Sequence, residues 1–195
     1  MKILRIVGMF ACGALFAAHA NADMVFTGTM AGTNEIPANS SSASGFTSVS
    51  INDSLTLMTV HVEWSGLTGG LPAAAHIHCC IAPGTNVGVA VGFPSFTSSL
   101  AGTYDQVFDL LNASIYTSGF LTTFGGGTAA GARDALIAGL TGGQAYSNIH
   151  NAMFGGGEIR ANLAPAPVPL PAAAWLLLSG IGALGSARAR RVRRA

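Results

Sequence analysis

The stretch LTLMTVHVEW, residues 55 to 64, carries the clearest structural pattern in the chain. Apolar and polar side chains alternate along it, a period of two that is typical of a β-strand with one buried face. The stretch therefore predicts a strand lying over a hydrophobic core. The expected core face holds Met58, Val60, Val62 and Trp64, and the opposite face holds Thr59, His61 and Glu63.

Outward from this strand, short apolar runs recur between clusters of Gly, Ser, Thr and Asn. The chain has 26 glycines, and such frequent turn signals favour an all-β domain, an antiparallel β-sandwich or barrel. One short helix is expected near 128–140, where apolar residues recur at helical spacing. A hairpin turn is expected at Asn52-Asp53. Further strands are expected at 24–30, 46–52, 74–80, 87–91, 104–111, 144–150 and 158–163.

The first 22 residues have the parts of a secretory signal peptide. Lys2 and Arg5 supply positive charge, an uncharged apolar run covers 6–18, and small residues follow. That run is too short to anchor a protein in a bilayer. We predict a signal peptide over 1–22, cleaved after Ala22 or, as second choice, after Ala20.

The chain beyond position 163 divides into three unlike parts. A Pro-rich linker over 164–171 leads into an uncharged apolar stretch, 170–187, and an Arg-rich tail, 188–195, ends the chain. About 18 apolar residues are just enough for a transmembrane helix, and the arginines favour the cytoplasmic side of the membrane. The sequence predicts a transmembrane helix over 170–187, with the body outside the inner membrane.

The C-terminal segment contains the short motif Val168-Pro169-Leu170-Pro171, followed after the apolar stretch by Arg188, Arg190 and Arg191. These residues resemble the PEP-CTERM sorting signal of Gram-negative bacteria, with Leu where the motif has Glu. The resemblance implies transient anchoring in the inner membrane and processing by an exosortase-type sorting enzyme. It also implies release to the cell surface or the extracellular matrix of a biofilm, with exopolysaccharide or other surface proteins as partners.

The whole-chain charge of +1 conceals an acidic body. Seven of the nine lysines and arginines lie in the terminal segments. Residues 23–163 keep Arg133 and Arg160 against eight acidic residues, a net charge of −6. An acidic body argues against nucleic acid and against an anionic membrane surface as partners.

Three segments of the body, residues 23–163, stand out: FTGTMAGTNEIP near its start, AAHIH in the middle and YSNIHNAMFGGGEIRANL at its end. Taken in this order they resemble the CHRD domain, a module named after chordin. The resemblance implies an antiparallel β-sandwich or barrel, superoxide-dismutase-like or immunoglobulin-like, and no established activity. The sequence departs from the family pattern at Cys79-Cys80, where the family usually turns through Gly.

Two histidines two residues apart form the main candidate site. His76 and His78 leave the same face of their expected strand, and such a pair can share a copper or zinc ion. His150, on a later strand, is the third candidate ligand. The alternatives are surface positions or a structural, hydrogen-bonded network of the histidines with His61, Glu158 and Arg160, in which Glu158 is also a candidate to orient a ligand. A copper–zinc dismutase uses about six histidines and an aspartate, more than this sequence places.

Only two cysteines, Cys79 and Cys80, remain once the signal peptide is removed. By strand parity Cys80 shares the face of the histidines and Cys79 opposes it. A disulfide is the default in an exported protein, but neighbouring cysteines bond only through a strained ring. A vicinal disulfide, two free thiols and intermolecular bridges are the open alternatives, with the vicinal disulfide or an oligomer link preferred.

Catalytic motifs are missing from the sequence. It contains no Gly-x-Ser-x-Gly elbow, no P-loop and no HExxH motif. The first hypothesis is accordingly a non-enzymatic, exported protein with a structural, adhesive or binding role in the cell envelope or exopolysaccharide matrix. The alternative is a copper- or zinc-binding protein, with or without redox activity, that uses the His-x-His strand.

Overall fold

The computed structural model describes residues 23–167. Within these residues no helix combines the length and the apolar character needed to cross a bilayer. The predicted signal peptide (1–22), sorting motif (168–171), apolar helix (170–187) and Arg-rich tail (188–195) lie outside the described residues. Ala164 and Pro165, at the start of the predicted linker, form the end of the last strand.

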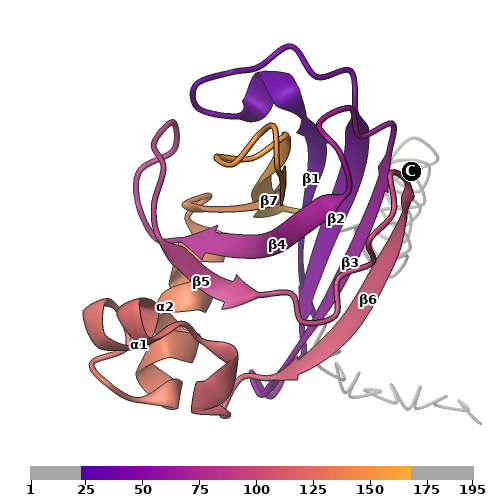
Figure 1. The fold of residues 1–195 in the computed structure, drawn as a ribbon. Coiled ribbons are helices and arrows are strands. Elements are labelled where there is room, and N and C mark those ends of the chain that lie inside the picture. Colours follow the sequence, from indigo (N-terminus) through magenta and orange to yellow (C-terminus); the bar gives the residue numbers. More distant parts are fainter. Residues whose placement is uncertain (1–22, 168–195) are drawn as a thin grey trace, which may run out of the picture.

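Eight antiparallel strands form one curled sheet, a half-barrel (Figure 1). Their order across the sheet is β5-β4-β7-β8-β1-β2-β3-β6, so the first and last strands of the chain pair with each other in its middle. The predicted all-β antiparallel fold is confirmed, and each strand end lies within two residues of its expected position. The strands are β1 (Met24–Ala31), β2 (Ser44–Ile51), β3 (Leu57–Ser65), β4 (Pro72–Cys79), β5 (Val89–Gly92), β6 (Gly102–Asp109), β7 (Ala145–Asn151) and β8 (Ile159–Pro165).

The alternating stretch at 55–64 forms β3, and its two faces are those expected. Met58, Val60 and Val62 are fully buried, and Trp64 is nearly so. Burying a side chain of this size contributes about 1.5–3 kcal/mol. Since β3 pairs with β2 on one side and β6 on the other, this apolar row lies at the centre of one half of the core.

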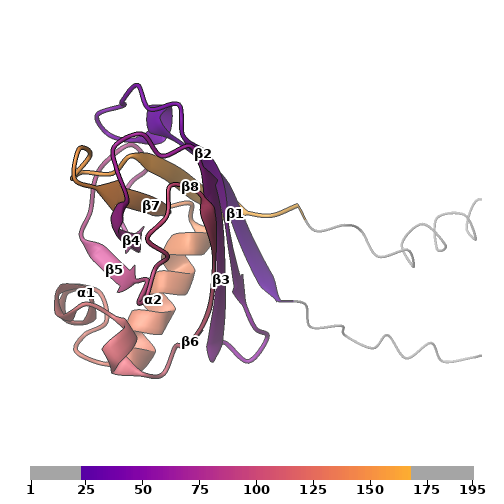
Figure 2. The same ribbon diagram turned by 45° about the vertical axis from the view of Figure 1, so that its right-hand side comes forward.

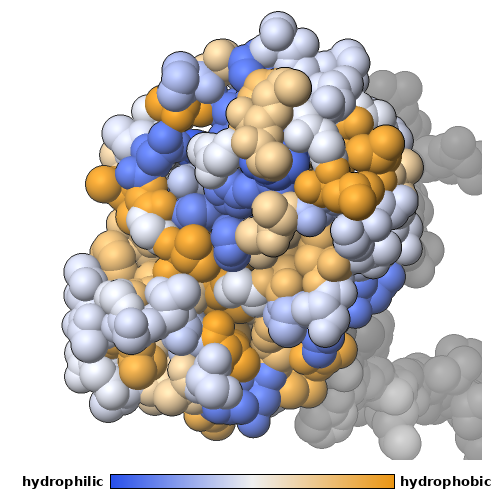
Figure 3. Space-filling view, viewed as in Figure 1, coloured by the Kyte–Doolittle hydropathy of each residue, from blue (hydrophilic) through white to orange (hydrophobic). Residues whose placement is uncertain are grey.

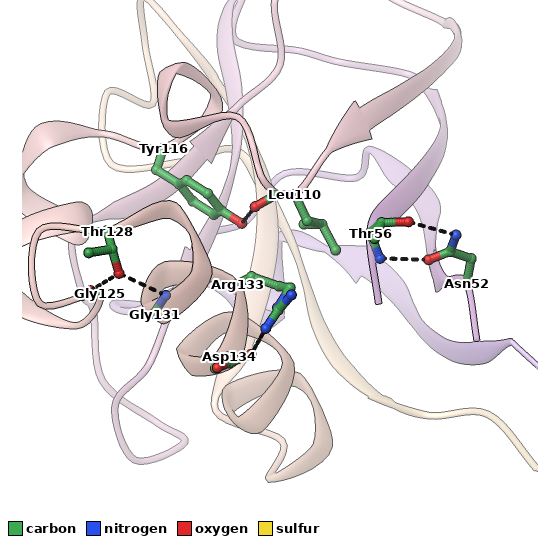
Figure 4. A network of polar contacts seen from close by, with 9 residues as sticks. All are labelled: Asn52, Thr56, Leu110, Tyr116, Gly125, Thr128, Gly131, Arg133 and Asp134. Carbon is green, nitrogen blue, oxygen red and sulfur yellow. Dashed lines mark hydrogen bonds and ion pairs between the residues drawn. The ribbon is translucent and has the colours of Figure 1, made fainter. Parts of the chain in front are cut away.

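The turn before β3 explains why the strand begins at 57 and not at 55. Asn52 Oδ1 accepts a hydrogen bond from the backbone N–H of Thr56 at 2.9 Å (Figure 4). It accepts a second one from the Leu57 N–H, also at 2.9 Å. Leu55 lies in the left-handed region, with φ of 57°. The turn at Asn52-Asp53 is confirmed, and it extends further than the sequence pattern indicates.

The predicted helix is present as α2 (Ala129–Thr141). Thr128 caps its N-terminus by accepting a hydrogen bond from the Gly131 N–H at 3.1 Å (Figure 4). The helix lies on the inner side of the curled sheet and packs against β8, β4 and β7 (Figure 2). Its apolar face therefore fills the half of the core opposite β3, with Ala132, Leu136 and Leu140 fully buried.

Three short helical segments were not predicted. They are η1 (Gly32–Asn34), η2 (Ala113–Ile115) and α1 (Ser118–Thr123). Thr117 caps α1 by accepting from the Phe120 N–H at 3.2 Å, and Phe120 is buried. A helix of six residues has too few turns to display a periodic apolar face, so its sequence reads as a loop.

Candidate functional site

One face of β4, β7 and β8 is polar, and it points away from the core. Along β4 the residues Ala75, Ile77 and Cys79 are buried in the core, so the alternate positions point outward. Loops cover this outer face, and hydrophilic residues gather in the middle of it (Figure 3). We call it the polar face; it consists of His76, His78, Tyr146, Asn148, His150 and Arg160.

The three candidate histidines converge on the polar face. One ring nitrogen from each lies within 4.8 Å of the others. The pairing of β4 with β7 causes this, because His150 is the register partner of Ala74, beside His76. The ring centroid of His76 lies 5.0 Å from that of His150 and 5.6 Å from that of His78.

Backbone carbonyls set the proton positions on two of these rings. His78 Nδ1 lies 2.7 Å from the Val87 carbonyl oxygen, and His150 Nδ1 lies 3.0 Å from that of Gly155. A carbonyl oxygen only accepts, so each Nδ1 must carry the proton and donate it. In the neutral imidazole the Nε2 atom of each ring is then left with a lone pair.

Two nitrogens of the cluster are buried with no hydrogen-bond partner, His76 Nδ1 and His150 Nε2. Asn148 Oδ1 lies 3.1 Å from His78 Nε2. An amide oxygen only accepts hydrogen bonds, so it cannot donate one to the Nε2 lone pair. Buried polar atoms are nearly always satisfied, so these exceptions need an explanation. Unpartnered ring nitrogens in a cluster of three histidines whose nitrogens lie within 4.8 Å of one another suit an electron-pair acceptor such as a metal ion.

Burial keeps the three histidines in the form that binds metals. Burial, together with the nearby His150 and His78 rings, lowers the pKa of His76 from 6.5 to about 4. Burial likewise lowers the pKa values of His78 and His150, although the carbonyl groups of Val87 and Gly155 partly oppose this. All three rings are therefore neutral at physiological pH.

These shifts predict that acid weakens the fold. A histidine whose folded pKa lies below the unfolded value of about 6.5 stabilises the fold above pH 6.5, and that stability is lost as pH falls toward 4. Replacing His76 by Gln should therefore reduce the loss of unfolding free energy between pH 7 and pH 4.5 by about 1–2 kcal/mol, allowing for solvent screening. Urea titrations at the two pH values measure this difference.

The control for this experiment is Glu35→Gln, because the pKa of Glu35 is shifted so that acid strengthens the fold instead of weakening it. Burial raises the pKa of Glu35 to about 7, while a hydrogen bond from Asn148 and the charge of Arg160 oppose the rise. Stability from a neutral Glu35 is present below pH 4.5 and lost as pH rises toward 7. Glu35→Gln should thus steepen the acid loss. An acid loss identical in wild type and His76→Gln would contradict the assignment.

Arg160 joins the polar face through Tyr146. Its guanidinium carbon lies 3.3 Å from the centroid of the Tyr146 ring, and the His78 ring stacks on Tyr146 at 4.5 Å with an interplanar angle of 3°. Arg160 also donates to Asn86 Oδ1 at 3.0 Å and to the Thr85 carbonyl at 3.3 Å. It therefore holds the 81–88 loop, which presents the Val87 carbonyl to His78.

Glu158 is buried but does not meet the histidines. Its carboxylate accepts hydrogen bonds from Ser41 Oγ, from Thr68 N and Oγ1, from Gly69 N and from Asn151 Nδ2. Burial alone would raise its pKa, but these hydrogen bonds together lower it. The hypothesis that Glu158 orients His150 is corrected, because Glu158 ties the 38–43 and 66–70 loops to the end of β7.

His61 is also separate from the site. It lies on the outer face of β3, where its Nδ1 is 2.7 Å from Asp105 Oδ1 of β6, and both side chains are exposed. In the sheet order β3 and β4 belong to opposite halves of the half-barrel. The hypothesis that His61 joins the network of the other histidines is corrected for this reason.

Cys79 and Cys80 are joined in a vicinal disulfide. The strand β4 ends at Cys79, so strand parity does not extend to Cys80. Both sulfurs pack against Gly139 of α2, and Cys80 Sγ lies 3.3 Å from the Ala135 carbonyl oxygen. Cys80 therefore lies on the helix side of the sheet. The prediction from strand parity, which put Cys80 on the face of the histidines, is wrong.

Two members of the site, Asn148 and Glu35, were missed in the sequence. Asn148 stands two residues before His150, so the alternation of Tyr146, Asn148 and His150 was a usable signal. Glu35 follows η1, far from the other residues in sequence, and is 5% exposed. Asn148 Nδ2 donates to Glu35 Oε1 at 3.4 Å. No periodicity could connect a loop residue to this face.

Comparison with known proteins gives one match. The family model of the CHRD domain matches residues 26–163. This segment contains the whole sheet except the first two residues of β1 and the last two of β8. The match confirms the family expected from the three matching segments. No curated protein and no solved structure matches the chain.

Proposed function

Since the chain belongs to the CHRD domain family, we propose that it is an exported, non-enzymatic binding protein that holds a copper or zinc ion between His76, His78 and His150. One observation carries the proposal. Three imidazole nitrogens converge within 4.8 Å, two of them are buried without a partner, and carbonyl groups fix the protons of two rings on the far nitrogen.

The ligand chemistry favours copper or zinc over other ions. Neutral imidazole suits both metals, whereas calcium and magnesium prefer oxygen ligands. Zinc–nitrogen bonds of about 2.0–2.1 Å put tetrahedral ligands about 3.3 Å apart, so the side chains have to close by about 1.5 Å at most. The fourth position is then open to water or to Asn148 Oδ1, which already lies beside His78 Nε2.

A binding role fits the surroundings of the site. The carboxylate of Glu158 is occupied by five donors from the loops, and Asn148 stands between Glu35 and His78. Neither Glu158 nor Glu35 lies beside the histidines, where a general acid or base would have to stand.

Metal binding itself can be measured directly. The purified protein, treated with a chelator and titrated with zinc or copper(II), should bind one equivalent. Replacing His76 or His150 by Ala should weaken binding more than about 100-fold, since even the loss of a residue that only supports a ligand costs 10–100-fold. His61→Ala is the matched control and should bind like the wild type. Equal affinity in all variants, or no stoichiometric binding, would refute the site.

The setting of this function is the cell envelope. The predicted signal peptide over 1–22 and the PEP-CTERM-like sequence over 168–195 support export, transient inner-membrane anchoring and processing by an exosortase-type enzyme. We propose the cell surface or the extracellular matrix as the destination, with exopolysaccharide or other surface proteins as partners. Fractionation of cells and matrix tests this, and mature protein found in the cytoplasm would overturn it.

A further inference from the structure

A cleft of about 830 Å³ opens beside the histidine site. It lies on the open side of the half-barrel, where β5 and β6, the two ends of the strand order, do not pair with each other. Its walls come from the start of β4, the segment after β5, the end of β6 and the segment around η2. The volume is within the range of about 300–1,000 Å³ that is usual for small-molecule sites.

Aromatic rings line this cleft. Phe93, Phe96, Phe108 and Tyr116 contribute to its wall. Phe93 stands between two of the others, with ring centroids 6.2 Å from Phe96 and 6.4 Å from Phe108. The Tyr116 hydroxyl donates to the Leu110 carbonyl at 2.9 Å (Figure 4), so this phenol is already satisfied and adds only its ring to the wall.

Polar groups stand beside the rings. Gln106 Nε2 donates to the Val107 carbonyl at 2.9 Å, which leaves Gln106 Oε1 as an acceptor. Asp109 adds a carboxylate oxygen, since only its Oδ1 is used by the Leu111 N–H. Among the residues that line the cleft in the described part of the chain, Asp109 carries the only formal charge. The cleft therefore has acceptors and no cation.

His76 belongs both to the cleft and to the histidine site. Its Nδ1 is buried without a hydrogen-bond partner, and the same ring belongs to the histidine cluster and to the cleft wall. An ion on Nδ1 leaves the proton on Nε2, because a neutral imidazole carries only one. A bound ion thus fixes His76 Nε2–H as a hydrogen-bond donor on the other side of the ring.

We propose that this cleft binds an uncharged saccharide unit, and that a metal ion at the three histidines strengthens this binding through His76. The second half rests on the proposed function. A sugar hydroxyl both donates and accepts, so it complements the His76 donor and the Gln106 and Asp109 acceptors, while the C–H faces of the ring pack on the aromatic wall. Anions are disfavoured, because the lining has no lysine or arginine and the body is acidic.

Titration calorimetry of the full-length protein tests the proposal, with cellobiose, maltose and N,N′-diacetylchitobiose as probes and zinc-loaded and chelated samples compared. At least one disaccharide should bind with one-to-one stoichiometry, about 5–10-fold more tightly in the zinc form. Gln106→Ala should weaken it about 10-fold, as loss of a buried hydrogen bond does. Gln144→Ala, outside the cleft, is the control and should have no effect.

His150→Ala separates the two halves of the proposal. His150 is not part of the cleft wall, so this variant should keep the disaccharide affinity of the chelated wild type and lose the response to zinc. No saturable binding of any probe, in either form, would overturn the cleft. Binding that zinc does not strengthen, in a protein shown to hold zinc, would overturn the coupling. Failure of zinc to bind, with disaccharide bound, would overturn the coupling and the metal site while supporting the cleft.

Catechol and glucuronic acid complete the design. Both share a hydroxylated ring with the sugars, but catechol is aromatic and glucuronic acid is charged. Stronger binding of either than of every disaccharide would overturn the assignment to an uncharged sugar. Weak or no binding of both, beside a saturable disaccharide, would support it.

Discussion

Glu158→Ala is expected to lower the free energy of unfolding by about 3 kcal/mol, because five neutral donors lose their acceptor and two of them belong to buried residues. The Glu158 side chain is 0% exposed. Ser41, Thr68 and Gly69 donate to it at 2.6–3.2 Å, and Asn151 donates as well. Its removal leaves these donors without their acceptor, and Gly69 and Asn151 are buried, whereas Ser41 is half-buried and Thr68 is exposed.

Urea unfolding followed by tryptophan fluorescence measures this effect. The matched control is Glu63→Ala, at an exposed position on β3, which should change the unfolding free energy by less than about 0.5 kcal/mol. A Glu158 variant as stable as the control would show that the loop donors are satisfied without the carboxylate. Because Glu158 touches no histidine, the folded fraction of this variant should still bind zinc with the wild-type affinity.

The second large effect is expected from Gly139→Ala. A Cβ atom at position 139 would collide with the Sγ atoms of both Cys79 and Cys80. Alanine favours a helix by about 1 kcal/mol over glycine, yet the collision should outweigh this gain. We expect a net destabilisation of about 3 kcal/mol, at the upper end of overpacking costs, because the bonded sulfurs and the helix backbone have little room to move.

A suppressor variant tests the cause. Replacing Cys79 and Cys80 by Ala removes the sulfur atoms, so Gly139→Ala should cost little in that background. Gly119→Ala in α1 is the control, since nothing lies within 4 Å of its added Cβ, and it should be neutral or stabilising. If Gly139→Ala costs the same with and without the cysteines, the collision with sulfur is not the reason.

Period-two alternation predicted the strands, because each strand has one buried face. It placed Met58, Val60 and Val62 in the core and set His76 and His78 on one face, and both results hold. Alternation does not tell which strands are neighbours. The meeting of His76 with His150 depends on the pairing of β4 with β7, and the separation of His61 depends on the position of β3 in the other half.

The predictions that were wrong concern residues at or beyond the ends of strands, where the alternation of faces no longer applies. Parity assigned Cys80 to the histidine face, but β4 ends one residue earlier and the disulfide turns toward α2. Glu158 was expected beside His150 because only a short loop separates them. Its carboxylate instead accepts hydrogen bonds from the 38–43 and 66–70 loops. No local sequence pattern reveals these contacts.

The two carbonyl groups that orient the histidines belong to backbone, not to side chains. Any residue at position 87 or 155 still presents a carbonyl, so ordinary substitutions there leave the ring protons in place. Insertions or deletions in the 81–88 and 152–157 loops move the carbonyls themselves. The lengths of these two surface loops, more than the identity of their side chains, therefore set how the rings of His78 and His150 are oriented toward the proposed ion.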